Sequence, residues 1–418
     1  MMERELALEV LIAYEKEKSY LNITLNHVLD HADLDRQGKN LVTALVYGTI
    51  QYRILLEYQL EPFVEGKHIK VYERMLLLMS MYQHMFMHMP DYAVVNEAVE
   101  MAKKKRGKKA GSFVNAVLKN SFKAQRSLEG LNEEERLSIE TSHPLWMVKL
   151  FIHQYGLEIA KKIMSADNDV PLRTGRINTL KISREDLLHS DPHFQEGALS
   201  PDALYYEGGN IAHTQAYKEG YLTIQDESSQ MVARLLAPLP GQIVLDMCGA
   251  PGSKTTHLAA LMENKGEIDV FDLYEHKIAL INNNCQRLGV KIVHAKAGDA
   301  SLIETFGKRT YDRILLDGPC SGLGVLARKP EIKYHDSTVM DEIIPLQQKL
   351  LENAYALCKN SGKIVYSTCT INKKENEKQI EAFIKKHPDM KVIEEKTILP
   401  YEYHSDGFFM CLMEKDSQ

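Results

Sequence analysis

Cysteine is scarce in this sequence, which has six cysteines among 418 residues. None belongs to a CxxC pair, and none stands at the spacing from histidine that a zinc site requires. These absences exclude a disulfide-stapled secreted domain and a structural zinc site, so we expect a reducing compartment and no bound metal. Cys285, Cys358 and Cys411 fall in helix-like or apolar stretches, which predicts a buried packing role for them.

Long apolar runs are also missing. No stretch approaches the roughly 20 apolar residues that a membrane-spanning helix needs. The N-terminal run MMERELALEVLIAYEKEKSYL carries acids among its apolar positions, which is typical of a helix and not of a secretory signal. We therefore expect a cytoplasmic protein without a membrane contact.

Basic residues are not in excess, since the formal net charge is −6 and the first 150 residues are balanced. This bulk charge argues against a general polyanion binder. One segment differs, because nine basic residues and no acid lie between Met101 and Ser127. Its densest part predicts a contact with RNA phosphates, although basic runs are usually solvated surface. The residues of this basic run are Lys103, Lys104, Lys105, Arg106, Lys108 and Lys109.

The first region, residues 1–130, is predicted to be helical throughout because its apolar residues recur at spacings of three and four. The methionines between Met75 and Met89 are expected to fill a helical core. Glycine and proline are few here, and they predict breaks between helices. The expected breaks are at Gly38, Pro62, Gly66, Pro90, Gly107 and Gly111.

The remaining chain divides into two further regions. Residues 131–220 are predicted to be a connector, with helices followed by a small α/β subdomain. From residue 221 to 418 strands alternate with helices, which is typical of a parallel sheet with crossover helices. The strands are expected within 242–247, 266–273, 291–300, 311–320, 362–370 and 407–414.

A cofactor site is predicted at the carboxyl ends of these strands, where open parallel sheets bind ligands. Successive strands end in Asp246, Asp272, Asp299 and Asp317. The loop CGAPGSK after the first strand brings glycine backbone and a helix N-terminus together. It is neither a dinucleotide nor a phosphate loop. An acidic rim without a phosphate loop suits S-adenosylmethionine, while the spacing alone leaves a nicotinamide-dependent dehydrogenase open.

Two strands end in cysteine-bearing turns, DGPC with Cys320 and STC with Cys369. A single cysteine at a strand end is usually an inert buried thiol, but two on one rim favour chemistry. A thiolate that adds to carbon 6 of cytosine makes carbon 5 nucleophilic toward a methyl donor. Asp317 can assist at N3, where negative charge develops. The chemistry by itself does not choose between the two thiols.

Four segments, VLDMCGAPGSKTTHLA, RILLDGPCSGLGVLARKPEIKY, GKIVYSTCTINKKENEKQI and DGFFM, resemble the bacterial Sun/Fmu family of ribosomal RNA small-subunit methyltransferases. HPLWMVKLFIHQYG and RINTLKISREDLL resemble the family's connector, and FVNAVLKN its N-terminal domain. The resemblance covers nearly the whole chain. It implies an α/β Rossmann-like methyltransferase domain at 221–418, preceded by an all-α NusB-like RNA-binding domain at 1–130 and a ferredoxin-like connector at 131–220.

The resemblance also implies cytosine-5 methylation of 16S ribosomal RNA, naked or in an early small-subunit particle. By this transfer Cys369 is the nucleophile, Cys320 assists release of the methylated base, and Asp317 is one of the acidic contacts. The implied S-adenosylmethionine contacts are Cys248, Gly249, Ala250, Pro251, Gly252, Ser253, Lys254, Asp272, Asp299 and Asp317. The family more often has AAPGGK and DAPC, so Gly249, Ser253 and Gly318 are small-for-small departures.

Two other functions compete with this prediction. A DNA cytosine methyltransferase using Cys320 would need a target-recognition domain after the fourth strand, and the remaining sequence is too short for one. A non-catalytic RNA-binding factor built on the N-terminal domain would not need the paired thiols.

Overall fold

A computed structural model describes residues 1–17 and 21–417, and the chain forms two compact units. Unit 1 comprises Met1–Asn168 together with Lys329–His335. Unit 2 comprises Asp169–Arg328 and the chain from Asp336 onward. No helix among the described residues is long and apolar enough to cross a membrane.

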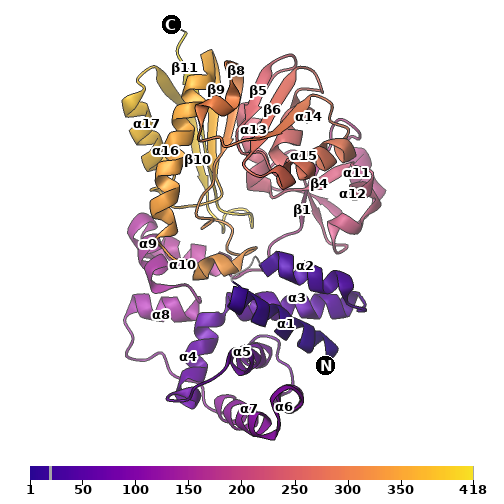
Figure 1. The fold of residues 1–418 in the computed structure, drawn as a ribbon, viewed down its shortest axis with the longest axis vertical. Coiled ribbons are helices and arrows are strands. Elements are labelled where there is room, and N and C mark those ends of the chain that lie inside the picture. The colour runs from indigo at the N-terminus through magenta and orange to yellow at the C-terminus, as the bar shows by residue number, and fades with distance from the viewer. Residues whose placement is uncertain (18–20, 418) are drawn as a thin grey trace. The chain divides into compact units, whose positions relative to one another are not determined.

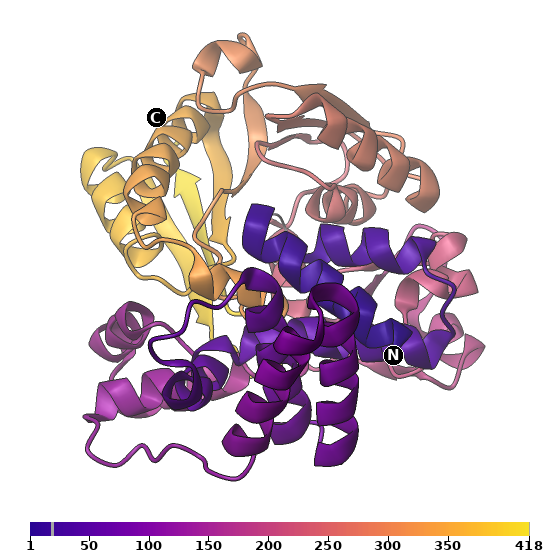
Figure 2. The same cartoon turned by 60° about the horizontal axis from the view of Figure 1, so that its bottom comes forward.

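Unit 1 is helical, as the apolar spacing predicts (Figures 1 and 2). Side-chain caps begin two of its helices: Asp35 accepts from the Gly38 amide, and Asn132 forms a capping box with Glu135. Met75, Met79 and Met81 are buried in the core, as predicted. The helices are α1 (Met2–Glu17), α2 (Leu21–His31), α3 (Arg36–Gln51), α4 (Arg53–Val64), α5 (Val71–Met85), α6 (Asp91–Arg106), α7 (Lys108–Ser121), α8 (Glu133–Glu140), α9 (Leu145–Tyr155) and α10 (Leu157–Ala166).

Three of the predicted helix breaks are wrong. Gly38 lies in the first turn of α3, Gly111 in the first turn of α7, and Pro62 in the last turn of α4. Glycine costs less near a helix end than in the middle, because the terminal turns are less constrained. Pro62 removes one amide donor, and α4 ends two residues later. Gly66, Pro90 and Gly107 do lie between helices.

The short segment 329–335 belongs to unit 1, although more than 150 residues separate it from the helices of that unit. It forms a 3-10 turn, η3 (Pro330–Tyr334). Tyr334 donates its hydroxyl to the Ile50 carbonyl at 2.8 Å, and the fully buried Lys333 donates to Asn168 Oδ1 at 2.9 Å. The boundaries that the sequence predicts between the three regions, after residues 130 and 220, stay predictions.

Unit 2 begins with a small antiparallel sheet in the order β2-β3-β1-β4. Two helices connect its strands, and the pattern β-α-β-β-α-β in this order is the ferredoxin-like topology. The elements are β1 (Thr174–Ile177), α11 (Arg184–Ser190), β2 (Phe194–Glu196), β3 (Ala203–Tyr206), η1 (Ile211–His213), α12 (Gln215–Lys218) and β4 (Leu222–Ile224).

The rest of unit 2 is a seven-stranded sheet in the order β10-β11-β9-β8-β5-β6-β7. Strands β5 to β9 pair in parallel, while β11 and β10 are antiparallel additions at one edge. The elements are α13 (Glu227–Leu236), β5 (Ile243–Asp246), α14 (Ser253–Leu261), β6 (Glu267–Asp272), α15 (Glu275–Leu288), β7 (Val293–Ala297), η2 (Ile303–Phe306), β8 (Tyr311–Asp317), α16 (Val339–Leu357), β9 (Cys358–Thr368), α17 (Glu377–Lys386), β10 (Met390–Ile398) and β11 (Phe408–Lys415).

Helices cover both faces of this sheet (Figure 1), so its central strands are buried on both sides. In β8, Ile314 and Leu316 pack in one core cluster with α16 and α17, while Leu315 packs in the other with α13 and α14. Cys285, Cys358 and Cys411 are buried, as predicted. The carboxyl ends of β5 to β9 therefore form one edge, and the polar residues that end these strands meet there.

Candidate active site

The two cysteine-bearing turns lie side by side at this edge. β8 and β9 are parallel neighbours with Asp317 in register with Ser367, so Cys320 and Cys369 follow directly at adjacent strand ends. Their Sγ atoms are 3.2 Å apart, within hydrogen-bonding distance for sulfur. Neither cysteine residue is fully buried.

The surroundings of the two thiols make them unequal. The hydrogen bond with Cys369, then burial, then the nearby Glu375 carboxylate raise the pKa of Cys320 well above its ordinary value. The raised pKa favours the protonated form of the Cys320 thiol. Either sulfur can be the donor of the hydrogen bond between the two thiols.

A buried carboxylate behind the thiols holds the Cys320 turn in place. Glu375 is fully buried and accepts from the Ser321 amide at 2.8 Å and the Ser321 hydroxyl at 2.5 Å. It also accepts from the side chains of Asn372 at 2.9 Å and Gln347 at 3.2 Å. Four donors compensate the burial of this charge. The sequence reasoning missed Glu375, because its run of polar residues is typical of an exposed helix start.

The turn after Cys320 also contacts the backbone of Cys369. Gly324 donates its amide to the Cys369 carbonyl at 3.0 Å and accepts from the Gly407 amide at 2.7 Å. A Cβ at Gly324 would lie only 1.9 Å from the Gly407 carbonyl oxygen, so a side chain does not fit there. The two cysteine turns are thus fastened together from both sides.

The loop from Cys248 to Lys254 follows β5 and leads into α14. Its N-cap residue, Gly252, has no side-chain capping bond, so the first amide groups of α14 are available to an anionic ligand. Asp272, at the end of β6, accepts from the Ala250 amide at 3.3 Å and lies 3.4 Å from the Lys277 ammonium. This set of donors and acceptors fits a ligand with a carboxylate and ribose hydroxyls, as S-adenosylmethionine has.

The carboxylates of the rim have different environments. Asp317 accepts from Lys254 at 2.7 Å and from the Ser367 hydroxyl at 2.8 Å. Asp246 is fully buried, and burial raises its pKa to about 7 despite a hydrogen bond from Thr255. Burial, together with nearby carboxylates, likewise raises the pKa of the Cys248 thiol. Asp299 follows β7, is partly exposed, and accepts from the Ser301 amide at 2.8 Å.

Known proteins resemble the chain along its whole length. A family model described as 16S rRNA methyltransferase RsmB/F matches residues 233–414, the NusB family matches 1–123, and an RsmF/B-like ferredoxin-like domain matches 143–207. The protein named probable ribosomal RNA small subunit methyltransferase B from Bacillus subtilis is 40% identical, over 99% of this chain and 98% of that protein. The chain belongs to the ribosomal RNA small subunit methyltransferase B family.

Two further relatives extend this result. The protein of the same name from Synechocystis is 32% identical over 99% of each chain. The crystal structure of PH0851 is 25% identical and superposes with a TM-score of 0.85 over 99% of both chains. The predicted fold class is therefore confirmed: a NusB-like helical domain, a ferredoxin-like domain and a Rossmann-like methyltransferase domain follow one another.

The departures from the family's loop sequence differ in their structural consequences. A Cβ at Gly249 would lie 2.1 Å from Val270 Cγ2, so alanine at 249 would require Val270 to move. Gly318 has no neighbouring atom closer than 3.8 Å, and alanine fits there without change. Glycine at 249 is therefore matched to valine at 270 in this chain, whereas glycine at 318 is not constrained.

The predicted basic run lies in unit 1, at the end of α6 and the start of α7, and all of its side chains are exposed. Several of its charges are partly neutralised: Lys103 pairs with Glu100, Lys104 with Glu5 and Arg106 with Glu73. Lys105, Lys108 and Lys109 form no ion pair with any residue that the structure describes. Fewer residues of the basic run carry an unpaired positive charge than the sequence indicates.

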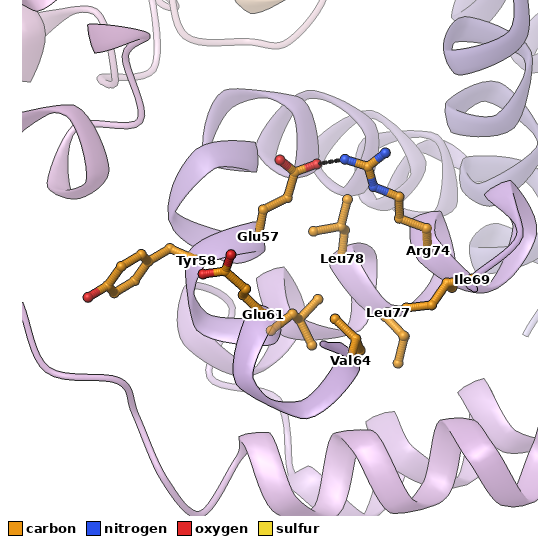
Figure 3. Close-up of a pocket in the computed structure, with 9 residues that line it drawn as sticks. Glu57, Tyr58, Glu61, Val64, Ile69, Arg74, Leu77 and Leu78 are labelled. Carbon is orange, nitrogen blue, oxygen red and sulfur yellow. Dashed lines mark hydrogen bonds and ion pairs between the residues drawn. The ribbon is translucent and has the colours of Figure 1, made fainter. Parts of the chain in front are cut away.

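A cavity of about 270 Å³ occurs in unit 1 and not at the cysteine pair (Figure 3). Residues of α4 and α5 form most of its lining. Leu77, Leu78 and Val64 provide apolar contacts, and Glu57 pairs with Arg74 at the rim. No thiol and no free nucleophile reaches this cavity, so it is not a site for the chemistry of unit 2.

Proposed function

We propose that the chain transfers a methyl group from S-adenosylmethionine to carbon 5 of a cytosine in 16S ribosomal RNA, through a covalent bond between Cys369 and carbon 6. The observation that supports this most is the pair of thiols 3.2 Å apart beside Asp317. Family membership supports the same reaction class, since the relatives are named as ribosomal RNA small subunit methyltransferases. S-adenosylmethionine, when bound, supplies the methyl group as an electrophile on a sulfonium.

The first step is addition of the Cys369 thiolate to carbon 6 of the base. The new sulfur–carbon bond takes the electron pair of the 5,6 double bond toward carbon 5, which becomes the nucleophile. Negative charge also develops at N3. We assign assistance at this atom to Asp317, which ends β8 three residues before Cys320 and accepts a hydrogen bond from Lys254.

Release of the product reverses the addition. A base removes the proton from carbon 5, the 5,6 double bond forms again, and the bond between carbon 6 and the Cys369 sulfur breaks. We assign assistance in this step to Cys320, because its sulfur lies 3.2 Å from the leaving sulfur and its raised pKa favours the protonated thiol. The methylated base then leaves while Cys369 returns to the thiolate.

The RNA requires a base that can leave its stack. Single-stranded and looped RNA presents such bases, and its 2′-hydroxyl groups distinguish it from DNA. We propose that the basic run of α6 and α7 adds phosphate contacts, with Lys105, Lys108 and Lys109 as its free charges. We propose that the substrate is 16S ribosomal RNA, either naked or in an early small-subunit particle.

Substitution of the two thiols tests the reaction. Cys369→Ala is expected to abolish methyl transfer, because no thiolate can add to carbon 6, while S-adenosylmethionine still binds. Cys320→Ala is expected to accumulate a covalent protein–RNA adduct, visible as a shifted band in a denaturing gel. Cys285→Ala, a buried cysteine of α15 outside the site, is the matched control and should keep its activity.

Two results would contradict the proposed reaction. Normal turnover by Cys369→Ala would show that the nucleophile is misassigned. Absence of S-adenosylmethionine binding to the unaltered protein in calorimetry would favour a non-catalytic RNA-binding factor.

A further inference from the structure

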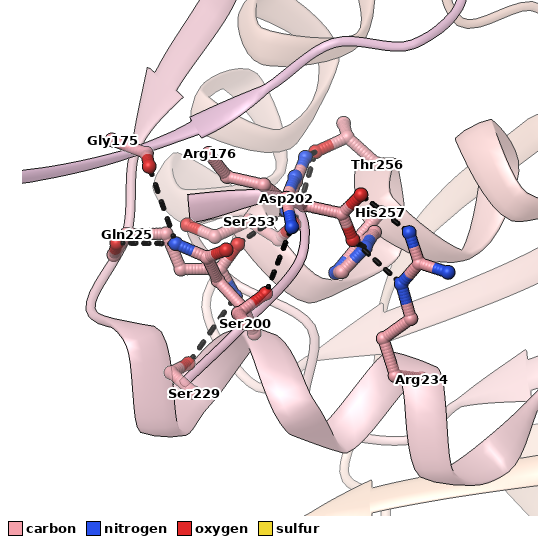
Figure 4. Close-up of polar contacts among 11 residues, drawn as sticks. Gly175, Arg176, Ser200, Asp202, Gln225, Ser229, Arg234, Ser253, Thr256 and His257 are labelled. Carbon is pink, nitrogen blue, oxygen red and sulfur yellow. Dashed lines mark hydrogen bonds and ion pairs between the residues drawn. The ribbon is translucent and has the colours of Figure 1, made fainter. Parts of the chain in front are cut away.

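The ferredoxin-like sheet buries an arginine against the cofactor loop (Figure 4). Arg176 of β1 is only 2% exposed, and its guanidinium donates to three groups. These are the Ser253 carbonyl at 2.5 Å, the Thr256 hydroxyl at 3.1 Å and the Gln225 side-chain oxygen. Two of the three acceptors belong to the first turn of α14, which follows directly from the loop 248–254.

Burial of this guanidinium is costly, and no carboxylate bonds to it directly among the described residues. Burial lowers the pKa of Arg176 to about 9, and its Nε has no hydrogen-bond partner within the described part of the chain. Packing alone would be served better by an apolar side chain of similar volume. What the guanidinium provides instead is a pair of donors with a fixed geometry toward α14.

The contact with Ser253 fixes the direction of one peptide group. In a planar trans peptide the carbonyl of Ser253 and the amide of Lys254 point in opposite directions. Because Arg176 holds the carbonyl, the Lys254 amide is directed outward from the start of α14. Thr256 strengthens the arrangement, since it accepts from Arg176 and donates to the Gly252 carbonyl at 2.8 Å.

A second polar contact joins the same two parts of unit 2 without touching the loop. Asp202, just before β3, accepts from Arg234 Nε at 2.6 Å and contacts His257 Nε2 at 2.9 Å. Burial lowers the pKa of His257 to about 4, so this histidine is neutral at physiological pH. Figure 4 shows the two contacts next to one another, with only Arg176 reaching Ser253. The Asp202 contact is therefore an internal reference for simple docking of the sheet.

We propose that Arg176 is a positioning residue for the S-adenosylmethionine site, through which the ferredoxin-like subdomain sets the geometry of the cofactor loop. This inference depends on the proposed function, because it takes the loop 248–254 to hold the methyl donor. Arg176 acts on the ligand only through the Ser253 peptide and Thr256. Its loss weakens cofactor binding without removing any reacting group.

The test compares matched variants of the full-length protein in titrations with S-adenosylhomocysteine. Arg176→Lys keeps a charge but can satisfy fewer acceptors, and Arg176→Gln removes the guanidinium. We expect the Kd to rise about tenfold for Arg176→Gln and less for Arg176→Lys, since hydrogen bonds to a charged group are removed. The KM for S-adenosylmethionine should rise similarly, while kcat at saturating cofactor and the Kd for RNA change little.

Arg234→Lys is the matched control, because it weakens the Asp202 contact and leaves the loop untouched. It should lower the melting temperature and keep the Kd for S-adenosylhomocysteine unchanged. An unchanged Kd in both Arg176 variants, or an equal loss in Arg234→Lys, would overturn the inference. If Arg176→Gln does not fold, Arg176→Lys decides alone. No binding by the unaltered protein would instead contradict the proposed function.

Discussion

Asp246 is a carboxyl group whose ionisation the fold disfavours. It is fully buried at the end of β5, and burial raises its pKa to about 7 in the folded protein. In the unfolded chain the group has an ordinary pKa, so the folded state binds the proton more tightly between these two values. Stability therefore falls as the pH rises from about 4 through 7.

Asp246→Asn is expected to remove this pH dependence. Asparagine keeps the shape and accepts from Thr255, yet it has no charge to bury. The free energy of unfolding should match that of the unaltered protein near pH 4 and exceed it at pH 8, by on the order of a few kcal/mol. Urea unfolding at both pH values measures the difference. An Asn variant that is less stable at pH 8 would show that Asp246 is ionised and stabilising.

Residues of the site differ in how far the sequence predicts them. Cys320 and Cys369 could be expected to meet because the carboxyl ends of adjacent parallel strands share an edge. The sequence does not predict how the environments of the two thiols differ, because the pKa of Cys320 is raised by Cys369 and by the buried Glu375. Glu375 is buried only because donors from separate segments converge on it, among them Gln347 of α16. Such convergence leaves no local pattern in the sequence.

Strands with a long apolar run in the sequence are predicted better than short or exposed strands. β5, β6, β7 and β8 fall within their expected ranges, and β11 extends one residue beyond its range. β9 begins four residues before its expected range, at Cys358, in a stretch that was expected to end a helix. β10 was not predicted, since most of its residues are exposed and it lies at the edge of the sheet. The strands of the ferredoxin-like sheet have three or four residues, which is too short to show an alternation.

The basic run of α6 and α7 leads to a prediction at the scale of these helices. Lys105, Lys108 and Lys109 are exposed and unpaired among the described residues, whereas Lys103, Lys104 and Arg106 have acidic neighbours. Reversing the three unpaired lysines to Glu should weaken RNA binding about tenfold or more at low salt. The slope of log K against log salt should fall by about one for each phosphate that is no longer neutralised.

A charge-matched control separates a phosphate contact from a general effect of charge. Reversal of Lys378, Lys385 and Lys386 on α17 changes the net charge by the same amount on exposed positions of unit 2. Filter binding over a range of salt concentrations compares the two triple variants. Equal losses of affinity would mean that bulk charge, and not the run on α6 and α7, governs RNA binding.

At the scale of the whole molecule, the segment 329–335 connects the two units in an unexpected way. The chain leaves unit 2 after Arg328, contributes η3 to unit 1, and returns at Asp336. The sequence shows only a short polar connection between a strand and a helix. Complete burial of Lys333 follows from partners in α3 and after α10, which are distant in sequence. No local pattern predicts such a contact.

Lys333→Ala tests how much unit 1 depends on this segment. The Lys333 ammonium donates to Asn168 Oδ1 at 2.9 Å and to the Gln51 carbonyl at 3.4 Å, and burial lowers its pKa to about 7. Without it the Gln51 carbonyl loses this donor, while Asn168 Oδ1 keeps the hydrogen bond from Gln51 Nε2, so we expect a loss of about 1–2 kcal/mol of unfolding free energy. Hydrogen exchange should become faster in α3 and α10 and stay unchanged in α14 and β8. Lys329→Ala, an exposed lysine of the same segment, is the control and should change neither. Faster exchange confined to unit 2 in Lys333→Ala would mean that the segment stabilises the methyltransferase sheet and not the helical unit.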